Sequence, residues 1–193
     1  MPLKSFCRPI LTNATPTKST EGLPEGLPEA EQALAALADK MRGAVAMDAK
    51  LIGIYSGGAW LAERLAALLP GEHPIGFIDV SFYRDDYGQK GLRAKVETTT
   101  LPFEVGGSRI VLVDDVLYTG RSVRAAINEL FDYGRPEKIE LAVLVDRGGR
   151  ELPIEATYVG ARISVARELS VVLNRAAGRF ELSVEPTTSE PRA

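Results

Sequence analysis

The chain has 193 residues, of which 45% are hydrophobic and 25% are charged, and its formal net charge is −3 at pH 7. This length suits one α/β domain with a substantial core, and the ordinary globular composition excludes a fully disordered protein. The small net charge excludes an overall electrostatic field that would attract nucleic acid, although it leaves room for local basic patches.

The cysteine content and the apolar runs narrow the setting further. Cys7 is the single cysteine, which excludes an intramolecular disulfide, and no cluster of cysteine and histidine offers a zinc site. Neither the first twenty residues nor any later run has the apolar length of a signal peptide or of a membrane helix. We therefore expect a cytoplasmic protein with no membrane partner.

The two ends of the chain are expected to lie outside the folded domain. Residues 1–28 are rich in Thr, Pro, Gly and Glu, which predicts a disordered tail. The polar segment 185–193 predicts a second loose tail. The folded domain is therefore expected to cover residues 29–184.

The first part of this domain predicts alternating helices and strands. Apolar residues at helical spacing predict a helix over 29–47, followed by a short buried strand over 50–56 and a helix over 57–70. A second strand is predicted within 73–83. The polar stretch 84–107 is too long for a tight connection and is typical of a functional lid.

The second part continues the same alternation. A run of β-branched residues predicts a strand over 108–115 that is buried on both faces, as in a parallel sheet. Helical spacing over 123–131 predicts a helix, with Ser122 as its cap and Gly134 just beyond its end. Further strands are expected in three segments: 138–149, 155–163 and 178–185.

This pattern predicts the fold class and the position of the ligand site. Alternating strands and helices favour an α/β fold with a mostly parallel sheet flanked by helices. In such sheets the ligand lies beyond the carboxyl ends of the strands. Ser56, Asp114 and Asp146 are all expected at such ends.

The stretch VLVDDVLYTGRSV, residues 111–123, carries the strongest chemical signal. A hydroxyl-rich and glycine-containing turn before a helix directs backbone N–H groups and the helix dipole at one point, which predicts a phosphate site. The acidic pair Asp114 and Asp115 would repel a phosphate, so it suits the nearby hydroxyl groups of a ribose 5-phosphate. Two alternatives stay open: a solvated acidic turn that caps an ordinary helix, and the acidic pair of a response-regulator receiver, although Lys138 is the only lysine beyond the motif.

This stretch resembles the phosphoribosyl pyrophosphate (PRPP) signature of type I phosphoribosyltransferases. Together with SFYRDD and GRPEKIELAVLVDRGGRELPIEATYVG, in this order, it resembles the PyrR family of pyrimidine operon regulators with uracil phosphoribosyltransferase activity. The resemblance covers about residues 29–184. It implies the type I phosphoribosyltransferase fold, with a small hood built from terminal segments.

The resemblance also implies roles for individual residues. Asp114 and Asp115 would be catalytic and would hold the ribose hydroxyls. The ribose 5-phosphate would be bound by Val116, Leu117, Tyr118, Thr119, Gly120, Arg121 and Ser122. Pyrophosphate would be bound by Ser56, Gly57, Gly58 and Arg84, although some relatives have an arginine where this chain has the Ser-Gly-Gly loop. The base would be bound near Asp146, Arg147 and Gly148.

The implied reaction displaces pyrophosphate from PRPP by uracil and gives UMP. Mg²⁺ would enter with PRPP, with no metal ligands from the protein. The family also implies binding to pyrimidine-operon leader mRNA, for which the candidates are Arg147, Arg150, Arg162 and Arg167, unless these are scattered surface arginines. A homo-oligomer, dimeric or larger, is expected. Two alternatives to the main reading are a UMP-dependent RNA-binding attenuator with little catalysis, and a phosphoribosyltransferase for another base.

Overall fold

A computed structural model describes residues 26–80 and 98–187 of the protein. The predicted tail 1–25, the end of the C-terminal tail and most of the predicted lid, residues 81–97, lie outside the described residues. The helices and strands, in chain order, are α1 (Ala30–Met41), β1 (Lys50–Ile54), α2 (Gly57–Leu68), β2 (Ile75–Ile78), β3 (Arg109–Leu117), α3 (Arg121–Tyr133), β4 (Lys138–Asp146), β5 (Tyr158–Arg162), β6 (Leu169–Ala176) and β7 (Arg179–Pro186).

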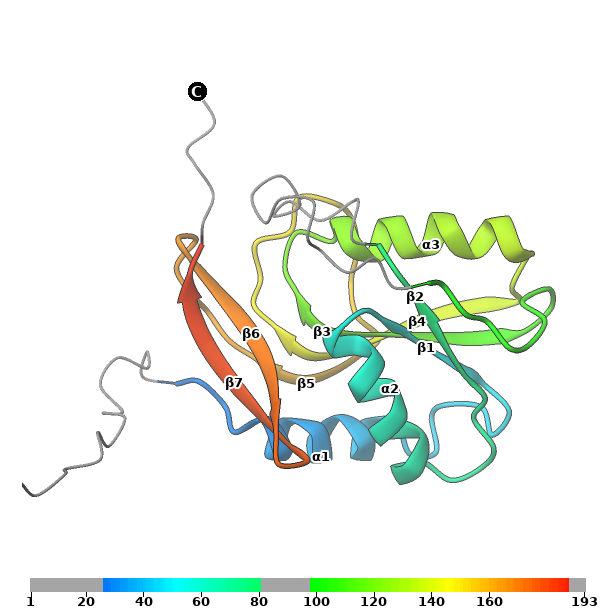
Figure 1. The fold of residues 1–193 in the computed structure, drawn as a ribbon, viewed down its shortest axis with the longest axis horizontal. Coiled ribbons are helices and arrows are strands. Elements are labelled where there is room, and N and C mark those ends of the chain that lie inside the picture. The colour runs from blue at the N-terminus through cyan, green and yellow to red at the C-terminus, as the bar shows by residue number, and fades with distance from the viewer. Residues whose placement is uncertain (1–25, 81–97, 188–193) are drawn as a thin grey trace, which may run out of the picture.

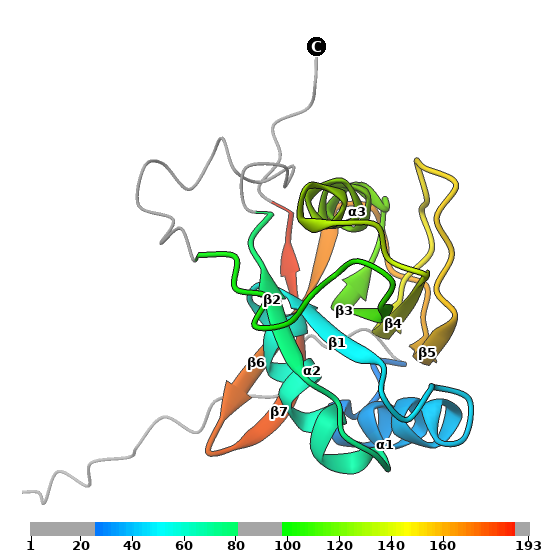
Figure 2. The same cartoon turned by 90° about the vertical axis from the view of Figure 1, so that its right-hand side faces the viewer.

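The predicted parallel sheet is confirmed. Its five strands lie in the order β2-β1-β3-β4-β5 and all neighbouring pairs are parallel. Figure 2 shows α3 on one face of this sheet and α1 and α2 on the other. The chain therefore forms three layers, and each face of the sheet is covered by helices, as the β-branched runs indicated.

Alternation along each strand distributes the core between these two faces. On β3, Val111 and Val113 pack in the cluster that includes α1 and α2, whereas Ile110 and Leu112 pack in the cluster that includes α3. This period of two is the geometry of an extended chain, in which successive side chains point to opposite faces. The hydrophobic run of β3 is therefore explained by burial on both sides.

The hairpin β6–β7 forms a separate antiparallel sheet, and its first strand was not predicted. Its turn lies at Ala177 and Gly178, whose φ angles are 48° and 78°. Leu173 and Phe180 face inward and join the core cluster of α1 and α2. The alternation of apolar residues in this stretch was the signal that the prediction missed.

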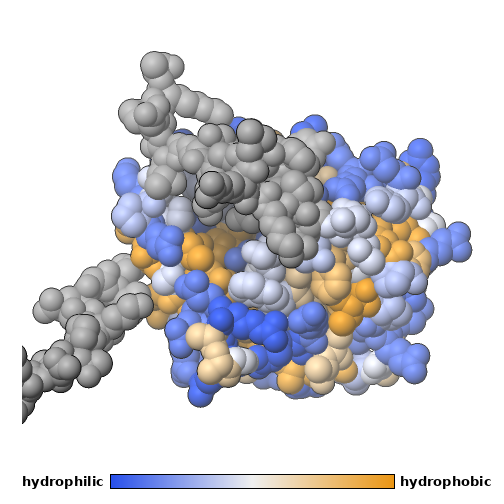
Figure 3. All heavy atoms as spheres, viewed as in Figure 1, coloured by the Kyte–Doolittle hydropathy of each residue, from blue (hydrophilic) through white to orange (hydrophobic). Residues whose placement is uncertain are grey.

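With α1, this hairpin forms the expected hood. Figure 1 shows it beside the carboxyl ends of the sheet strands. Glu31 on α1 accepts a hydrogen bond from the backbone N–H of Phe180 at 2.8 Å and pairs with Arg64 of α2 at 2.8 Å. Arg175 on β6 lies 3.7 Å from Glu63 of α2. Figure 3 shows hydrophilic side chains gathered where the hairpin meets α2.

Two predicted boundaries are wrong for local reasons. The helix predicted over 29–47 ends at Met41, because Gly43 takes a φ of +79° and turns the chain out of the helix. Ser122 is not the cap of α3 but lies inside its first turn. The N-cap position is held by Gly120, with a φ of +91°, and no side chain caps this helix.

Candidate active site

The acidic pair extends past the strand that neighbours β3. The pairing of β1 with β3 ends at Gly53 and Val113, whereas β3 stays paired with β4 as far as Leu117 and Asp146. Asp114 and Asp115 therefore follow directly where β1 stops and α2 begins. This step in the edge of the sheet gives both carboxylates a place at its carboxyl end.

The two carboxylates differ in their surroundings. Asp114 is buried, with 7% of its surface exposed, and its Oδ1 accepts a hydrogen bond from the backbone N–H of Asp115 at 3.0 Å. Asp115 is half-buried and faces the start of α2. The pair therefore combines one anchored carboxylate with one that is open to a ligand's hydroxyl groups.

The predicted pyrophosphate loop, residues 55–58, lies directly against this pair. A Cβ added at Gly57 would lie 2.5 Å from Oδ2 of Asp115, and one added at Gly58 would lie 2.3 Å from the carbonyl oxygen of Val113. The peptide bond between Tyr55 and Ser56 is cis. Only glycine allows this close approach of the helix start to β3.

Residues 117–121, here called the phosphate loop, lead from β3 into α3. The hydroxyl of Thr119 accepts a hydrogen bond from the backbone N–H of Arg121 at 3.3 Å, and Gly120 supplies the left-handed turn. The start of α3 follows, so its positive dipole end and first N–H groups face the loop. The structure thus brings the predicted phosphate-binding elements together beside Asp115.

The carbonyl groups of this loop are turned toward residues 146–152, here called the base-side loop. The carbonyl oxygen of Leu117 accepts the N–H of Arg147 at 3.1 Å, and that of Thr119 accepts the N–H groups of Glu151 and Leu152 at 3.1 and 3.2 Å. These bonds hold the negative ends of the peptide dipoles on the side of the base-side loop. An anion at the start of α3 is therefore not met by these oxygens.

The base-side residues Asp146 and Gly148 form a turn at the end of β4. Oδ1 of Asp146 accepts the N–H of Gly148 at 3.0 Å and pairs with Arg150 at 2.6 Å. Burial by itself would raise the pKa of Asp146, but the N–H of Gly148 and the charges of Arg150 and Arg162 outweigh it and lower this pKa. Asp146 is therefore a firmly ionised carboxylate that orders the turn.

Arg147 is an interior residue. Its guanidinium lies 4.2 Å from the ring centroid of Tyr118 and donates hydrogen bonds to the carbonyl oxygens of Leu169 at 2.6 Å and Ala166 at 3.0 Å. Its buried Nε has no hydrogen-bond partner among the described residues. Burial lowers its pKa. Arg147 thus links the phosphate loop to the beginning of β6 in the hood.

The structure separates the arginines proposed for RNA binding into two groups. The guanidinium groups of Arg147 and Arg150 are held by interior carbonyl and carboxylate oxygens. Arg162 and Arg167 have side chains that are 67% and 82% exposed, and their acidic partners lie as far as 3.9 and 3.8 Å away. Arg84, the remaining candidate for pyrophosphate, lies outside the described residues.

Sequence reasoning missed the role of Glu151. Its carboxylate accepts hydrogen bonds from Nε and Nη2 of Arg121, at 3.0 and 2.8 Å, and so ties the start of α3 to the base-side loop. The two residues are thirty positions apart. No spacing rule relates them, so only the folded chain reveals the pair.

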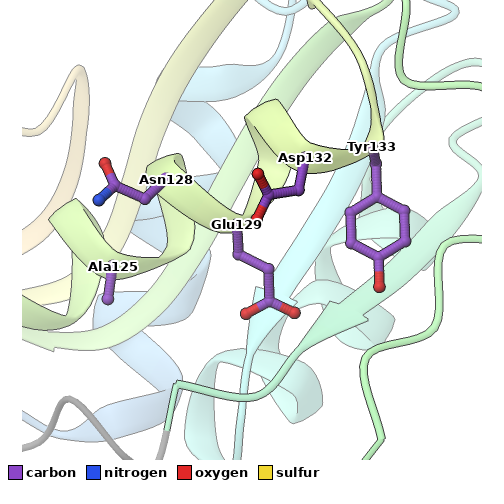
Figure 4. A pocket seen from close by; sticks show the side chains of 5 residues that line it. All are labelled: Ala125, Asn128, Glu129, Asp132 and Tyr133. Carbon is purple, nitrogen blue, oxygen red and sulfur yellow. The ribbon is translucent and has the colours of Figure 1, made fainter.

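A shallow pocket of about 380 Å³ lies on the outer face of α3. Figure 4 shows its lining residues, Ala125, Asn128, Glu129, Asp132 and Tyr133, which follow the helix away from the phosphate loop. In the described ranges, acidic, histidine and cysteine side chains form no group of three that could hold a metal ion. No helix of the described chain is long and apolar enough to cross a membrane.

Comparison with known proteins agrees with this geometry. Residues 26–171 match the family model described as "Phosphoribosyl transferase domain". The "Bifunctional protein PyrR" of Ralstonia nicotianae is 54% identical over 160 residues, which cover 81% of this chain and 91% of that protein. The protein of the same name from Pseudomonas paraeruginosa is 47% identical over 142 residues, covering 74% of this chain and 82% of that one.

Solved structures show the same fold. A hypoxanthine-guanine phosphoribosyltransferase from Bacillus anthracis superposes with a TM-score of 0.58 at 20% identity, covering 74% of this chain and 85% of that one. A purine phosphoribosyltransferase from Pyrococcus horikoshii has a TM-score of 0.52 at 28% identity, with coverage of 70% and 82%.

Proposed function

Because the chain belongs to the phosphoribosyl transferase domain family and, within it, to the PyrR proteins, we propose that it transfers the phosphoribosyl group of PRPP to uracil. The products are UMP and pyrophosphate. The observation that carries this proposal is the contact of the acidic pair with the glycine loop at Gly57, beside a phosphate loop at the start of α3. This membership sets aside the solvated turn and the receiver as accounts of the acidic pair.

The proposed site assigns each part of PRPP to a different element. The 5′-phosphate binds at the phosphate loop, where Thr119 and Gly120 shape the turn and the helix dipole favours an anion. The ribose hydroxyls donate hydrogen bonds to Asp114 and Asp115. The pyrophosphate binds over Ser56 to Gly58, where the backbone can approach closely.

The chemistry then depends on placing charge rather than on a covalent intermediate. Departure of pyrophosphate leaves positive charge on the ribose ring, and carboxylates fixed beside that ring stabilise it. Asp114 contributes from a buried position, in which its charge is screened less than in water. Asp115 orients the sugar through the hydroxyl groups that it accepts.

Mg²⁺ fits this donor set as a companion of PRPP. Its preferred ligands are oxygen atoms of carboxylates, phosphates and water, and Asp115 lies beside the pyrophosphate loop. When bound, the ion would neutralise charge on the leaving pyrophosphate. Asp115 is the residue of this chain that would hold it, through the ribose hydroxyls or water.

The base is proposed to bind next to the turn at Asp146 to Gly148. This turn lies at the carboxyl end of β4, adjacent to the ring of Tyr118. The carboxylate of Asp146 is occupied by Gly148 and Arg150, so recognition of uracil falls to backbone donors and acceptors of the base-side loop. Uracil presents two carbonyl oxygens and an N–H group that suit such contacts.

A regulatory role accompanies this activity in the proposal, as the name of the bifunctional relatives implies. The protein would bind pyrimidine-operon leader mRNA when UMP occupies the site. Arg162 and Arg167 are suitable phosphate contacts because both are highly exposed and weakly paired. We also propose a cytoplasmic homo-oligomer, for which Met47 and Leu68 offer exposed apolar surface.

The enzymatic proposal is tested with radiolabelled uracil, PRPP and Mg²⁺. We expect UMP from the purified protein and loss of most of this activity in Asp115→Asn. Competition with orotate, hypoxanthine and adenine reports the choice of base, and only uracil should be consumed. If another base is consumed instead, the assignment of uracil is overturned while the phosphoribosyltransferase assignment stands.

The regulatory proposal is tested by binding of the leader RNA from the operon that the protein would control, with and without UMP. We expect UMP to strengthen binding, and Arg162→Gln with Arg167→Gln to weaken it and reduce its salt dependence. Glu181→Gln, a change at an exposed acidic residue on β7, serves as a control for a surface substitution. No retention of RNA at physiological salt, with UMP at saturation, would refute this role.

A further inference from the structure

We propose that Arg150 is a positioning residue that sets the orientation of the phosphate loop and couples it to the base-side loop. The inference rests on the proposed function, because it concerns the binding of the phosphate of PRPP and UMP. It assigns Arg150 a task inside the site, in place of the RNA contact expected from its sequence alone.

The first observation is the number of elements that one guanidinium connects. Nη1 of Arg150 donates hydrogen bonds to the carbonyl oxygens of Tyr118 at 2.7 Å and Leu117 at 3.3 Å. Nη1 also donates to the carbonyl oxygen of Gly148 at 3.1 Å. Nε donates to Ile154 at 3.1 Å, and Nη2 pairs with Asp146 at 2.6 Å. A planar guanidinium with five N–H donors can serve this many acceptors at once.

The second observation is the direction of the acceptors. The carbonyl oxygen of Leu117 also accepts the N–H of Arg147, and that of Thr119 accepts N–H groups of residues 151 and 152. Tyr118 lies between these two positions, and Arg150 is the residue that binds its carbonyl oxygen. The consecutive carbonyl groups of residues 117–119 are therefore all held toward the base-side loop.

The orientation of these peptide groups matters because the ligand is a phosphate. A peptide group that rotates would bring its carbonyl oxygen toward the dianion, where the like partial charge repels, and would turn its N–H group away. Arg150 opposes this rotation at Tyr118 and adds a positive charge behind the loop. Its side chain is 23% exposed, so this charge is only partly screened by water.

The third observation is that the same side chain orders the base-side loop. Asp146 and Gly148 belong to the turn proposed for uracil, and both contact Arg150. The ring of Tyr118 reinforces the link: a Cβ added at Gly149 would lie 2.4 Å from Cε2 of this ring. A change at Arg150 therefore alters the two halves of the site together.

Arg162 provides a matched control. It faces the same carboxylate, Asp146, at 3.9 Å, but its side chain is 67% exposed and has no listed contact with the phosphate loop in the described structure. Arg162→Gln removes the same formal charge as Arg150→Gln near the same partner. A difference between the two variants then reports the hydrogen bonds to Leu117, Tyr118 and Gly148 and not the charge alone.

The test compares UMP with uridine, which lacks the phosphate. The ratio of the dissociation constants of uridine and UMP measures the contribution of the phosphate group. We expect Arg150→Gln to lower this ratio about tenfold and Arg162→Gln to leave it within about twofold. Arg150→Lys, which keeps the charge but not the fork of donors, should restore part of the ratio.

Steady-state kinetics give a second readout that a merely structural role would not move. Partial unfolding lowers the amount of active enzyme, and so kcat, without changing the KM for PRPP. We expect Arg150→Gln to raise that KM about tenfold and to change kcat less than KM. If the ratio and the KM stay at wild-type values in Arg150→Gln, with or without a lower melting temperature, the inference is overturned.

Direct binding of PRPP separates this inference from the proposed function. Calorimetric titration with PRPP and Mg²⁺ requires no base. If uracil proves not to be the substrate but Arg150→Gln still weakens PRPP binding relative to Arg162→Gln, the choice of base fails and the positioning role stands. If uracil is consumed and PRPP binding is equal in the two variants, the reverse holds.

Discussion

Gly57 and Asp115 approach so closely that a Cβ on the glycine would lie 2.5 Å from Oδ2 and 2.6 Å from Cγ of the carboxylate. The first residue of α2 and the second acid of β3 are therefore in van der Waals contact, although they are far apart in the chain. The φ angle of Gly57 is outside the left-handed region, so space rather than backbone conformation requires the glycine. In the proposed site, this contact places the leaving pyrophosphate next to the ribose hydroxyls.

The contact predicts that Gly57→Ala displaces Asp115. We expect kcat/KM for PRPP to fall about a hundredfold, because a shift of about 1 Å in a reacting group has an effect of this size. Gly106→Ala is the control, since its Cβ would lie at an ordinary 3.6 Å from Glu104. Steady-state kinetics of both variants check the prediction, and equal activity in the two would contradict the proposed placement of Asp115.

The acidic pair and the phosphate loop should fail in different ways. Asp114→Asn and Asp115→Asn keep the shape of the side chain but remove its charge, so we expect kcat to fall about a hundredfold with a smaller change in KM. Stopped assays at saturating PRPP measure this loss. Melting temperatures close to that of the wild type would exclude a loss of folding as its cause.

Gly120→Val should chiefly weaken PRPP binding. Gly120 has a φ of +91°, which a β-branched residue adopts only with strain, and its Cβ would lie 3.3 Å from Cβ of Ile154. We expect the dissociation constant of PRPP to rise more than about tenfold, since the turn that presents the start of α3 is altered. Calorimetry checks this, and a variant that binds PRPP normally but turns over slowly would reverse the assignment of roles.

Glu31→Gln should loosen the hood. Hydrogen bonding to the N–H of Phe180 is the main cause that lowers the pKa of Glu31, and Arg64 adds to it. The stabilisation is thus present above the ordinary pKa of 4.5 and is lost as the pH falls through the lowered value. We expect Glu31→Gln to reduce the free energy of unfolding by about 1 to 2 kcal/mol at pH 7. Urea denaturation measures it.

Glu29→Gln is the matched control for this prediction. Glu29 lies 3.7 Å from Arg179 of the same hairpin, but both side chains are more than half exposed. We expect a change below about 0.5 kcal/mol, as for most exposed ion pairs. Equal effects of the two substitutions would argue against Glu31 as the anchor of the hairpin.

Tyr158 predicts a loss of stability at high pH. Burial, together with the hydrogen bond to Glu140 and its charge, raises the pKa of Tyr158 from 10.0 to about 12. The unfolded chain therefore releases this proton first, and stability falls as the pH rises from 10 toward 12, by up to about 1.4 kcal/mol for each pH unit. Tyr158→Phe removes this contribution.

The comparison of wild type with Tyr158→Phe cancels the other groups that titrate in the same range. At pH 7 we expect the variant to be less stable by about 1 kcal/mol, the value of one hydrogen bond. Above pH 10 the difference should shrink and then change sign. Urea denaturation at pH 7 and pH 11 checks this, and a difference that is independent of pH would contradict it.

Much of the layered fold could be predicted because it depends on local periodicity. The run Ile110 to Val113 is apolar at every position, which is compatible with burial on both faces, and the helix at 123–131 follows from its spacing. The hairpin strand β6 was missed because its alternation was not weighed against the surrounding arginines. The early end of α1 and the cap position at Gly120 depend on left-handed glycines, whose φ angles the spacing does not reveal.

The sequence by itself determined the division of labour in VLVDDVLYTGRSV, because adjacent acids and a hydroxyl-glycine turn have opposite charge preferences wherever they are placed. Only the tertiary structure decided which distant groups complete the site. Gly57 meets Asp115, Glu151 meets Arg121, and Arg150 meets the carbonyl groups of Leu117 and Tyr118. These contacts arise where parallel strands end side by side, and strand order and register, rather than spacing along the chain, bring such residues together.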